Sequence, residues 1–116
     1  MLNQVIQQLN RATKHSIAGL NATWQHELAF RIEVVMTPVL IICALWLGET
    51  TVEKVLLIAA WGLVLVVELI NTAIESTIDR IGLERHSLSG QAKDQASAAV
   101  FVSVVMAIGV WLGILL

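Results

Sequence analysis

The chain has 116 residues, of which 57% are hydrophobic and only 14% are charged. This length allows one domain, 1–116, and the hydrophobic content excludes an intrinsically disordered chain and disfavours a water-soluble domain. The formal net charge of -2 leaves no surplus of cations for a nucleic-acid partner. The composition, with a mean hydropathy of +0.79, instead predicts a small integral membrane protein.

Residues 1–28 have the spacing of an amphipathic helix. Most of their apolar side chains recur at intervals of three or four positions, at Val5, Ile6, Leu9, Ala12, Ile17, Leu20, Trp24 and Leu28. Polar residues such as Arg11 and Gln25 occupy the other faces. A soluble packing helix would have the same pattern. Because strongly apolar segments follow, we expect instead an amphipathic helix that lies on the membrane surface.

Three apolar stretches follow, at 34–47, 55–67 and 98–116. The first two would form helices of only about 20 Å, whereas the hydrocarbon layer of a bilayer is about 30 Å thick. To span it, the first must extend backwards through polar residues, and the second forwards. The sequence therefore predicts an all-α membrane protein in which an N-terminal amphipathic helix precedes three transmembrane helices. The expected spans are 29–48, 51–78 and 96–116, with a cytoplasmic loop over 79–95.

The polar extensions of the first two spans meet on one side of the membrane, because the two helices are antiparallel. Six of the seven Lys and Arg residues lie on that side, at Arg11, Lys14, Arg31, Arg80, Arg85 and Lys93. Only Lys54 lies on the other side. The positive-inside rule therefore predicts that this side, together with the N-terminus, is cytoplasmic.

The second span carries a polar stripe. At about 100° per residue, Glu68, Asn71, Glu75 and Asp79 fall within roughly 80° of arc on an otherwise apolar helix. An acidic residue facing lipid at the bilayer centre costs about 3 kcal/mol, so the stripe should face protein or a wet cavity. One interpretation is structural, with Asn71 bonding between helices and Asp79 paired with Arg80 or Arg85. The other is proton, cation or phosphate chemistry at Glu68 and Glu75.

Further polar residues extend this candidate site. Glu27 and Glu75 could provide the pair of carboxylates that Mg²⁺ takes together with nucleotide phosphates, although Glu27 could also pair with Arg31. The expected loop and its C-terminal end add further polar groups, at Glu84, His86, Lys93 and Asp94. A single histidine is more often structural than functional, and the chain has no Walker A or protein-kinase motif. The residues alone indicate a cytoplasm-facing polar site in a three-helix membrane protein.

The run 68–79, ELINTAIESTID, resembles the signature of the prokaryotic diacylglycerol kinase family, E-x-hydrophobic-N-[ST]-small-hydrophobic-E-x-x-hydrophobic-D. The segment 27–33, ELAFRIE, is similar to the E-x-x-F-R-x-E segment of that family. The run 92–94, AKD, followed by SAA at 97–99, extends the likeness. The resemblance covers the chain from about Trp24 to the C-terminus.

This resemblance implies a homotrimer of three-span subunits in the bacterial cytoplasmic (inner) membrane, with sites shared between subunits. It implies transfer of phosphate from ATP, with Mg²⁺, to a lipid alcohol, most simply diacylglycerol, giving phosphatidic acid. By motif position, Glu68 resembles the catalytic base, and Glu27 and Glu75 resemble the metal ligands. Positions that hold phosphates or organise the base match Asn71, Lys93 and Asp94, and those that contact adenosine match Glu84 and His86. Two alternatives are an undecaprenol kinase of the same family and, from another class, a small proton-coupled transporter.

Overall fold

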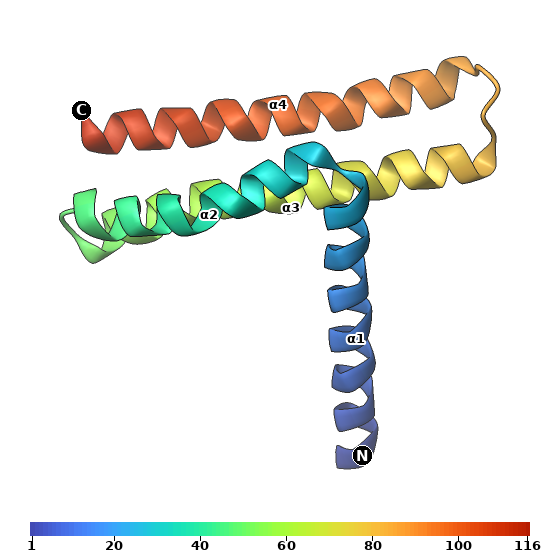
Figure 1. The fold of residues 1–116 in the computed structure, drawn as a ribbon, viewed down its shortest axis with the longest axis horizontal. Coiled ribbons are helices and arrows are strands. Elements are labelled where there is room, and N and C mark those ends of the chain that lie inside the picture. The colour runs from blue at the N-terminus through green and yellow to red at the C-terminus, as the bar shows by residue number, and fades with distance from the viewer.

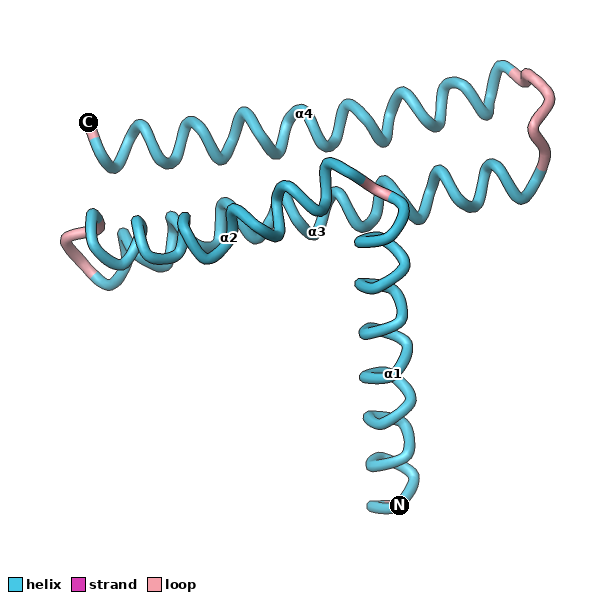
Figure 2. The backbone as a smooth tube through the Cα atoms, in the orientation of Figure 1, coloured by secondary structure: helices cyan, strands magenta, loops and turns pink.

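The computed structural model describes residues 1–116 and consists of four helices joined by short connections (Figures 1 and 2). These are α1 (Leu2–His26), α2 (Leu28–Leu47), α3 (Thr51–Ile81) and α4 (Ser87–Leu115). Helices α2, α3 and α4 run alongside one another in alternating directions, and α1 projects transversely from them (Figure 1). Each of α2, α3 and α4 is long and apolar enough to cross a membrane. The predicted all-α membrane fold is therefore confirmed.

The chain turns sharply between α1 and α2 at Glu27, whose backbone is extended (φ -120°, ψ 110°). The Arg31 guanidinium donates hydrogen bonds to the Trp24 carbonyl (2.6 Å) and the Gln25 carbonyl (2.8 Å), which caps the end of α1. The Glu27–Arg31 ion pair considered from the sequence is not formed, so that interpretation is wrong. The guanidinium is engaged by the carbonyls that the turn exposes, and the Glu27 carboxylate remains free of ion pairs.

The turn between α2 and α3 is set by local interactions. Thr50 caps α3 by accepting a hydrogen bond from the Glu53 backbone N–H (3.1 Å), and the Glu53 carboxylate accepts one from the Thr50 N–H (3.1 Å). Gly48 allows the chain to close, because a Cβ there would lie 2.8 Å from the Ala44 carbonyl oxygen. From this turn α2 extends back to Leu28 and α3 extends forward to Ile81, in the directions that the short apolar stretches predicted.

The connection between α3 and α4 is shorter than the loop expected over 79–95, because only residues 82–86 lie outside the helices. The expected extent was wrong since polar residues on exposed helix faces leave no apolar pattern, although their backbone is helical. At about 1.5 Å per residue, α2 is about 30 Å long and α3 about 46 Å. The hairpin of α3 and α4 therefore continues beyond the level at which α1 leaves the bundle (Figure 1).

Packing within one chain is sparse, since only 12 of 116 residues are buried. The middle helix is the most enclosed, because 22% of the apolar part of α3 is buried, against 11% for α2 and for α4. Two indole groups tie the neighbouring helices to α3: Trp61 donates to Thr37 Oγ1 (2.9 Å) and Trp111 donates to the Leu57 carbonyl (3.1 Å). The large apolar surface left exposed requires lipid or other protein around it.

Candidate functional site

The polar stripe of α3 runs from the interior of the bundle to its exposed end. Glu68 and Asn71 are 5% and 8% exposed, Glu75 is half-buried, and Asp79 is exposed. The two residues nearest the apolar part of the helix thus avoid lipid by facing protein, as the energetic cost of a lipid-facing carboxylate requires.

Negative charge is concentrated around Glu68. The carboxylates of Glu27, at the α1–α2 turn, and Glu75, two turns along α3, both repel that of Glu68. Glu33 of α2 is the fourth carboxylate of this cluster, because it and Glu68 also repel each other. The Oε2 atom of Glu33 is buried without a hydrogen-bond partner. No ion pair neutralises these four carboxylates. Such a cluster attracts cations. Glu33 is the second acid of the E-x-x-F-R-x-E segment, whose position on the same side of the membrane as Glu68 follows from the sequence, although no site role was predicted for it.

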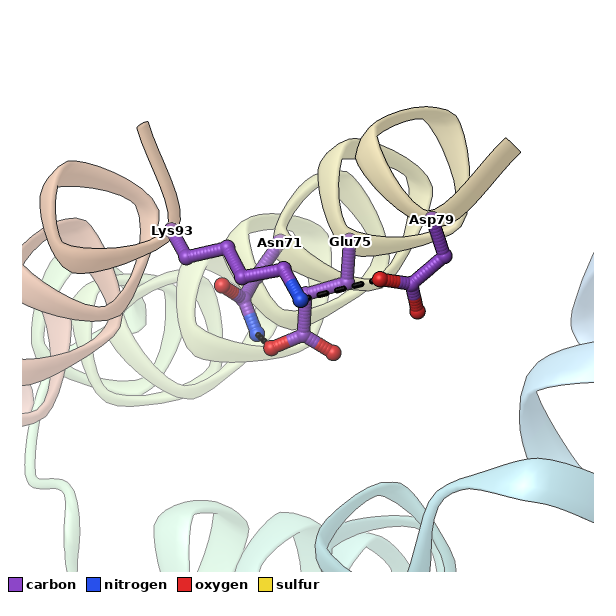
Figure 3. Close-up of polar contacts among 4 residues, drawn as sticks. All are labelled: Asn71, Glu75, Asp79 and Lys93. Atoms are coloured by element: carbon purple, nitrogen blue, oxygen red, sulfur yellow. Dashed lines mark hydrogen bonds and ion pairs between the residues drawn. The ribbon is translucent and has the colours of Figure 1, made fainter. Parts of the chain in front are cut away.

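Asn71 orients one of these carboxylates. Its Nδ2 atom donates a hydrogen bond to Glu75 Oε1 (3.2 Å), one turn further along α3 (Figure 3). Its only side-chain hydrogen bond lies within its own helix, so the interpretation of Asn71 as an interhelical bond is wrong for the single chain. The Oδ1 atom of Asn71 lies on the side of the amide away from Glu75, and it is buried without a hydrogen-bond partner (Figure 3).

The oxygen donors of this cluster suit a hard divalent cation. No three acidic, histidine or cysteine side chains converge closely enough to hold a metal without other ligands. A magnesium ion does not require such a cage, because it is usually held by one or two carboxylates together with substrate phosphates and water. Glu75, whose carboxylate has no ion-pair partner, therefore fits a metal that arrives with a phosphate ligand.

Lys93 of α4 reaches across to α3 and pairs with Asp79, its Nζ lying 2.9 Å from Asp79 Oδ1 (Figure 3). The sequence suggested Arg80 or Arg85 as the partner of Asp79, and this is wrong. Arg80 points about 100° around the helix from Asp79, whereas Lys93 belongs to the helix that packs against this face. The ion pair with Asp79 thus brings Lys93 to the polar stripe, as the predicted site requires.

A polar pocket of about 520 Å³ lies at the end of the α3–α4 hairpin. Asp79 and Lys93 form part of its wall, and Glu84, Arg85 and His86 of the connection form another part. His86 also has a structural role, because its Nδ1 atom accepts the Leu88 N–H (3.1 Å) and caps α4. The structure thus brings Glu84, His86 and Lys93 around one cavity.

A second groove, of about 580 Å³, separates the end of α1 from α3. Glu27 lines it from the α1–α2 turn, and Thr72 and Ser76 line it from the face of α3 next to the polar stripe. Asp94 lines neither this groove nor the polar pocket, and it is exposed on α4. One chain therefore brings most of the predicted site residues to the half of the bundle that contains the α3–α4 connection, and Asp94 lies outside both cavities.

Comparison with known proteins agrees with this architecture. The sequence model of the family described as "Prokaryotic diacylglycerol kinase" matches residues 14–115. A protein named "Diacylglycerol kinase" from Haemophilus influenzae is 47% identical over 92% of this chain and 91% of its own length. Proteins of the same name from Escherichia coli K12 and Pseudomonas aeruginosa are each 45% identical, over 87% and 96% of this chain and 83% and 90% of their own lengths. The chain belongs to the prokaryotic diacylglycerol kinase family.

Proposed function

We propose that this protein is an ATP-dependent diacylglycerol kinase that converts diacylglycerol to phosphatidic acid at the cytoplasmic membrane face. The observation that carries the proposal is the buried carboxylate of Glu68 beside the Asn71–Glu75 pair, with the Lys93 ammonium reaching over from α4. The name "Diacylglycerol kinase" of the three relatives supports this acceptor over undecaprenol. A proton-coupled transporter would have no need of Lys93 and the polar pocket beside its carboxylate.

Glu68 is the proposed catalytic base. Glu68 directly follows the apolar stretch 55–67, which supports a position near the membrane interface, where a diacylglycerol hydroxyl lies. The hydroxyl oxygen attacks the γ-phosphorus, the bond from that phosphorus to the oxygen of ADP breaks, and the hydroxyl proton passes to Glu68. Because no cation pairs with Glu68, its carboxylate remains available to accept that proton.

Glu27 and Glu75 are the proposed ligands of a divalent metal, most suitably Mg²⁺. When bound with ATP, the metal neutralises charge that develops on the phosphates. Asn71 supports this assignment through its hydrogen bond to Glu75, which fixes the carboxylate for binding. Lys93 and Asp94 position the phosphates and the reacting groups, and Glu84 and His86 of the polar pocket hold the adenosine.

The proposed assembly is a homotrimer in the bacterial cytoplasmic (inner) membrane, with the N-terminus in the cytoplasm. The six-to-one distribution of Lys and Arg between the two sides supports this orientation. The extensive apolar surface of one chain supports association with further copies. The separation of Asp94 from the pocket supports sites to which two subunits contribute. Cross-linking in micelles should give a ladder that ends at the trimer.

The deciding experiment measures transfer of labelled γ-phosphate from ATP to lipid by the purified protein in mixed micelles. We expect phosphatidic acid when diacylglycerol is present, and only background ATP hydrolysis when it is absent. A micelle series with undecaprenol separates the two lipid kinases. Proton-driven uptake by vesicles that needs no ATP, together with an absence of lipid phosphorylation, would refute the kinase proposal and support a transporter.

A further inference from the structure

The Asp79–Lys93 contact is the only ion pair in the chain, and it joins α3 to α4 in the wall of the polar pocket. Both side chains are about half exposed, at 52% for Asp79 and 44% for Lys93. An ion pair in such a position contributes little to folding, because water screens the attraction and both side chains lose freedom when they pair. Its position calls for an explanation other than stability.

Two carboxylates of α3 are available to Lys93. Asp79 follows Glu75 by one turn on the same face of the helix, and the ammonium of Lys93 pairs with Asp79 alone (Figure 3). Glu75 instead accepts its hydrogen bond from Asn71. The carboxylate proposed to bind metal is thus free of the cation that lies closest to it along the stripe, because a neighbouring residue holds that cation.

We propose that Asp79 is a positioning residue that holds Lys93 clear of Glu75 before nucleotide binds and releases it to the phosphates afterwards. This inference rests on the proposed function, in which Lys93 contacts phosphate and Glu75 contacts the metal. A triphosphate carries more negative charge than one carboxylate, so it outcompetes Asp79 for the ammonium. A half-exposed, screened pair is weak enough to exchange partners in this way.

The perturbation that tests this is Asp79→Asn, which keeps the size of the side chain and removes its charge. Without Asp79, the ammonium of Lys93 turns to Glu75 and competes with the metal. The dissociation constant of Mn²⁺ should rise about two- to fivefold, which is the range for one half-exposed charge interaction. It is obtained by measuring the free Mn²⁺ by electron paramagnetic resonance in the presence of a non-hydrolysable ATP analogue. The Mg²⁺ concentration that half-saturates turnover should rise equally, while kcat at saturating Mg²⁺ and ATP stays close to that of the parent protein.

A second measurement shows whether Asp79 acts through Lys93. In a Lys93→Gln background, Asp79→Asn should cause no further change in Mn²⁺ binding, because no ammonium remains to be held. Asp79→Glu keeps the charge and should bind Mn²⁺ as the parent does. Arg80→Gln is the matched control, since it alters an exposed charge at the adjacent position that does not line the polar pocket.

Equal losses of Mn²⁺ affinity in the presence and absence of Lys93 would show that Asp79 acts on its own and would overturn the inference. Parent-like binding in Asp79→Asn would overturn it as well. Should the asparagine variant yield too little folded protein, Asp79→Ser makes the same test. The proposed function fails separately, if the parent protein forms no phosphatidic acid, or if Lys93→Gln leaves the ATP dependence of turnover unchanged.

Discussion

Glu68→Gln should separate catalysis from folding. The change replaces one carboxylate oxygen by an amide group of similar size, at a side chain that is 5% exposed. Packing around the side chain is therefore retained. Because Glu27 and Glu75 both repel the carboxylate, removal of its charge relieves an unfavourable interaction. The free energy of unfolding should stay the same or rise, which is the opposite of the usual effect of changing a buried residue.

The rate of phosphoryl transfer should fall steeply, since an amide does not accept the hydroxyl proton. A general base contributes about 10²- to 10⁴-fold to a rate, which corresponds to about 3–5 kcal/mol of transition-state stabilisation. Binding of an ATP analogue should remain close to that of the parent, because Glu68 is not among the proposed nucleotide contacts. Glu68→Asp retains a base at the end of a shorter side chain, so its turnover should lie between that of the parent protein and that of Glu68→Gln.

The assay is phosphatidic acid formation per folded protein, measured together with analogue binding and with unfolding in mixed micelles. Glu49→Gln is the matched control, because it makes the same chemical change at an exposed carboxylate at the opposite end of the bundle. That variant should keep the parent turnover. Near-parent turnover in Glu68→Gln, or a loss that follows only the yield of folded protein, would refute Glu68 as the base.

Four other variants test one proposed metal ligand, the packing and a helix cap. Glu75→Gln should raise the Mg²⁺ concentration that half-saturates turnover at least severalfold, because the amide still accepts the hydrogen bond from Asn71 but has lost the charge. Excess Mg²⁺ should restore part of the rate. A loss of turnover that Mg²⁺ does not change would contradict Glu75 as a metal ligand. Leu57→Ala, at a fully buried position, should lower the unfolding free energy in micelles by about 2 kcal/mol, and Leu56→Ala, which is 48% exposed, much less. Thr50→Ala removes the cap of α3 and should cost about 1 kcal/mol in the same assay, without a change in Mg²⁺ dependence.

The helices could be predicted from the sequence because a membrane leaves few alternatives. A chain that spans lipid must satisfy its backbone internally, so long apolar stretches become helices, and their lengths show where polar residues must be included. The predicted extent of the loop over 79–95 was wrong for a related reason. Outside lipid a helix needs no apolar pattern, so the helical residues on both sides of 82–86 gave no signal.

The candidate site was predictable where it follows from one helix and not where two helices meet. Helical periodicity alone put Glu68, Asn71 and Glu75 on one face, and two of these are buried. The pairing of Asp79 with Lys93 depends on the register of α4 against α3, which no local pattern encodes. Similarly, Arg31 donates its hydrogen bonds to the last carbonyls of α1, which only the turn at Glu27 exposes. The i,i+4 spacing in the sequence suggested Glu27 as its partner instead.

Because α3 is longer than α2, the two substrates of the proposed reaction can reach the protein from different surroundings. In the proposed membrane placement, the part of the α3–α4 hairpin that continues past α1 is in water and meets solutes that diffuse in three dimensions. The part level with the start of α2 lies at the membrane surface and meets molecules that diffuse only within a leaflet. In the proposed reaction the acceptor thus never has to be extracted from the bilayer, and the nucleotide never enters it. Turnover would then depend on the surface density of the acceptor, not on its bulk amount. Diluting the lipid with inert detergent should slow the enzyme even when the total quantity of substrate is constant.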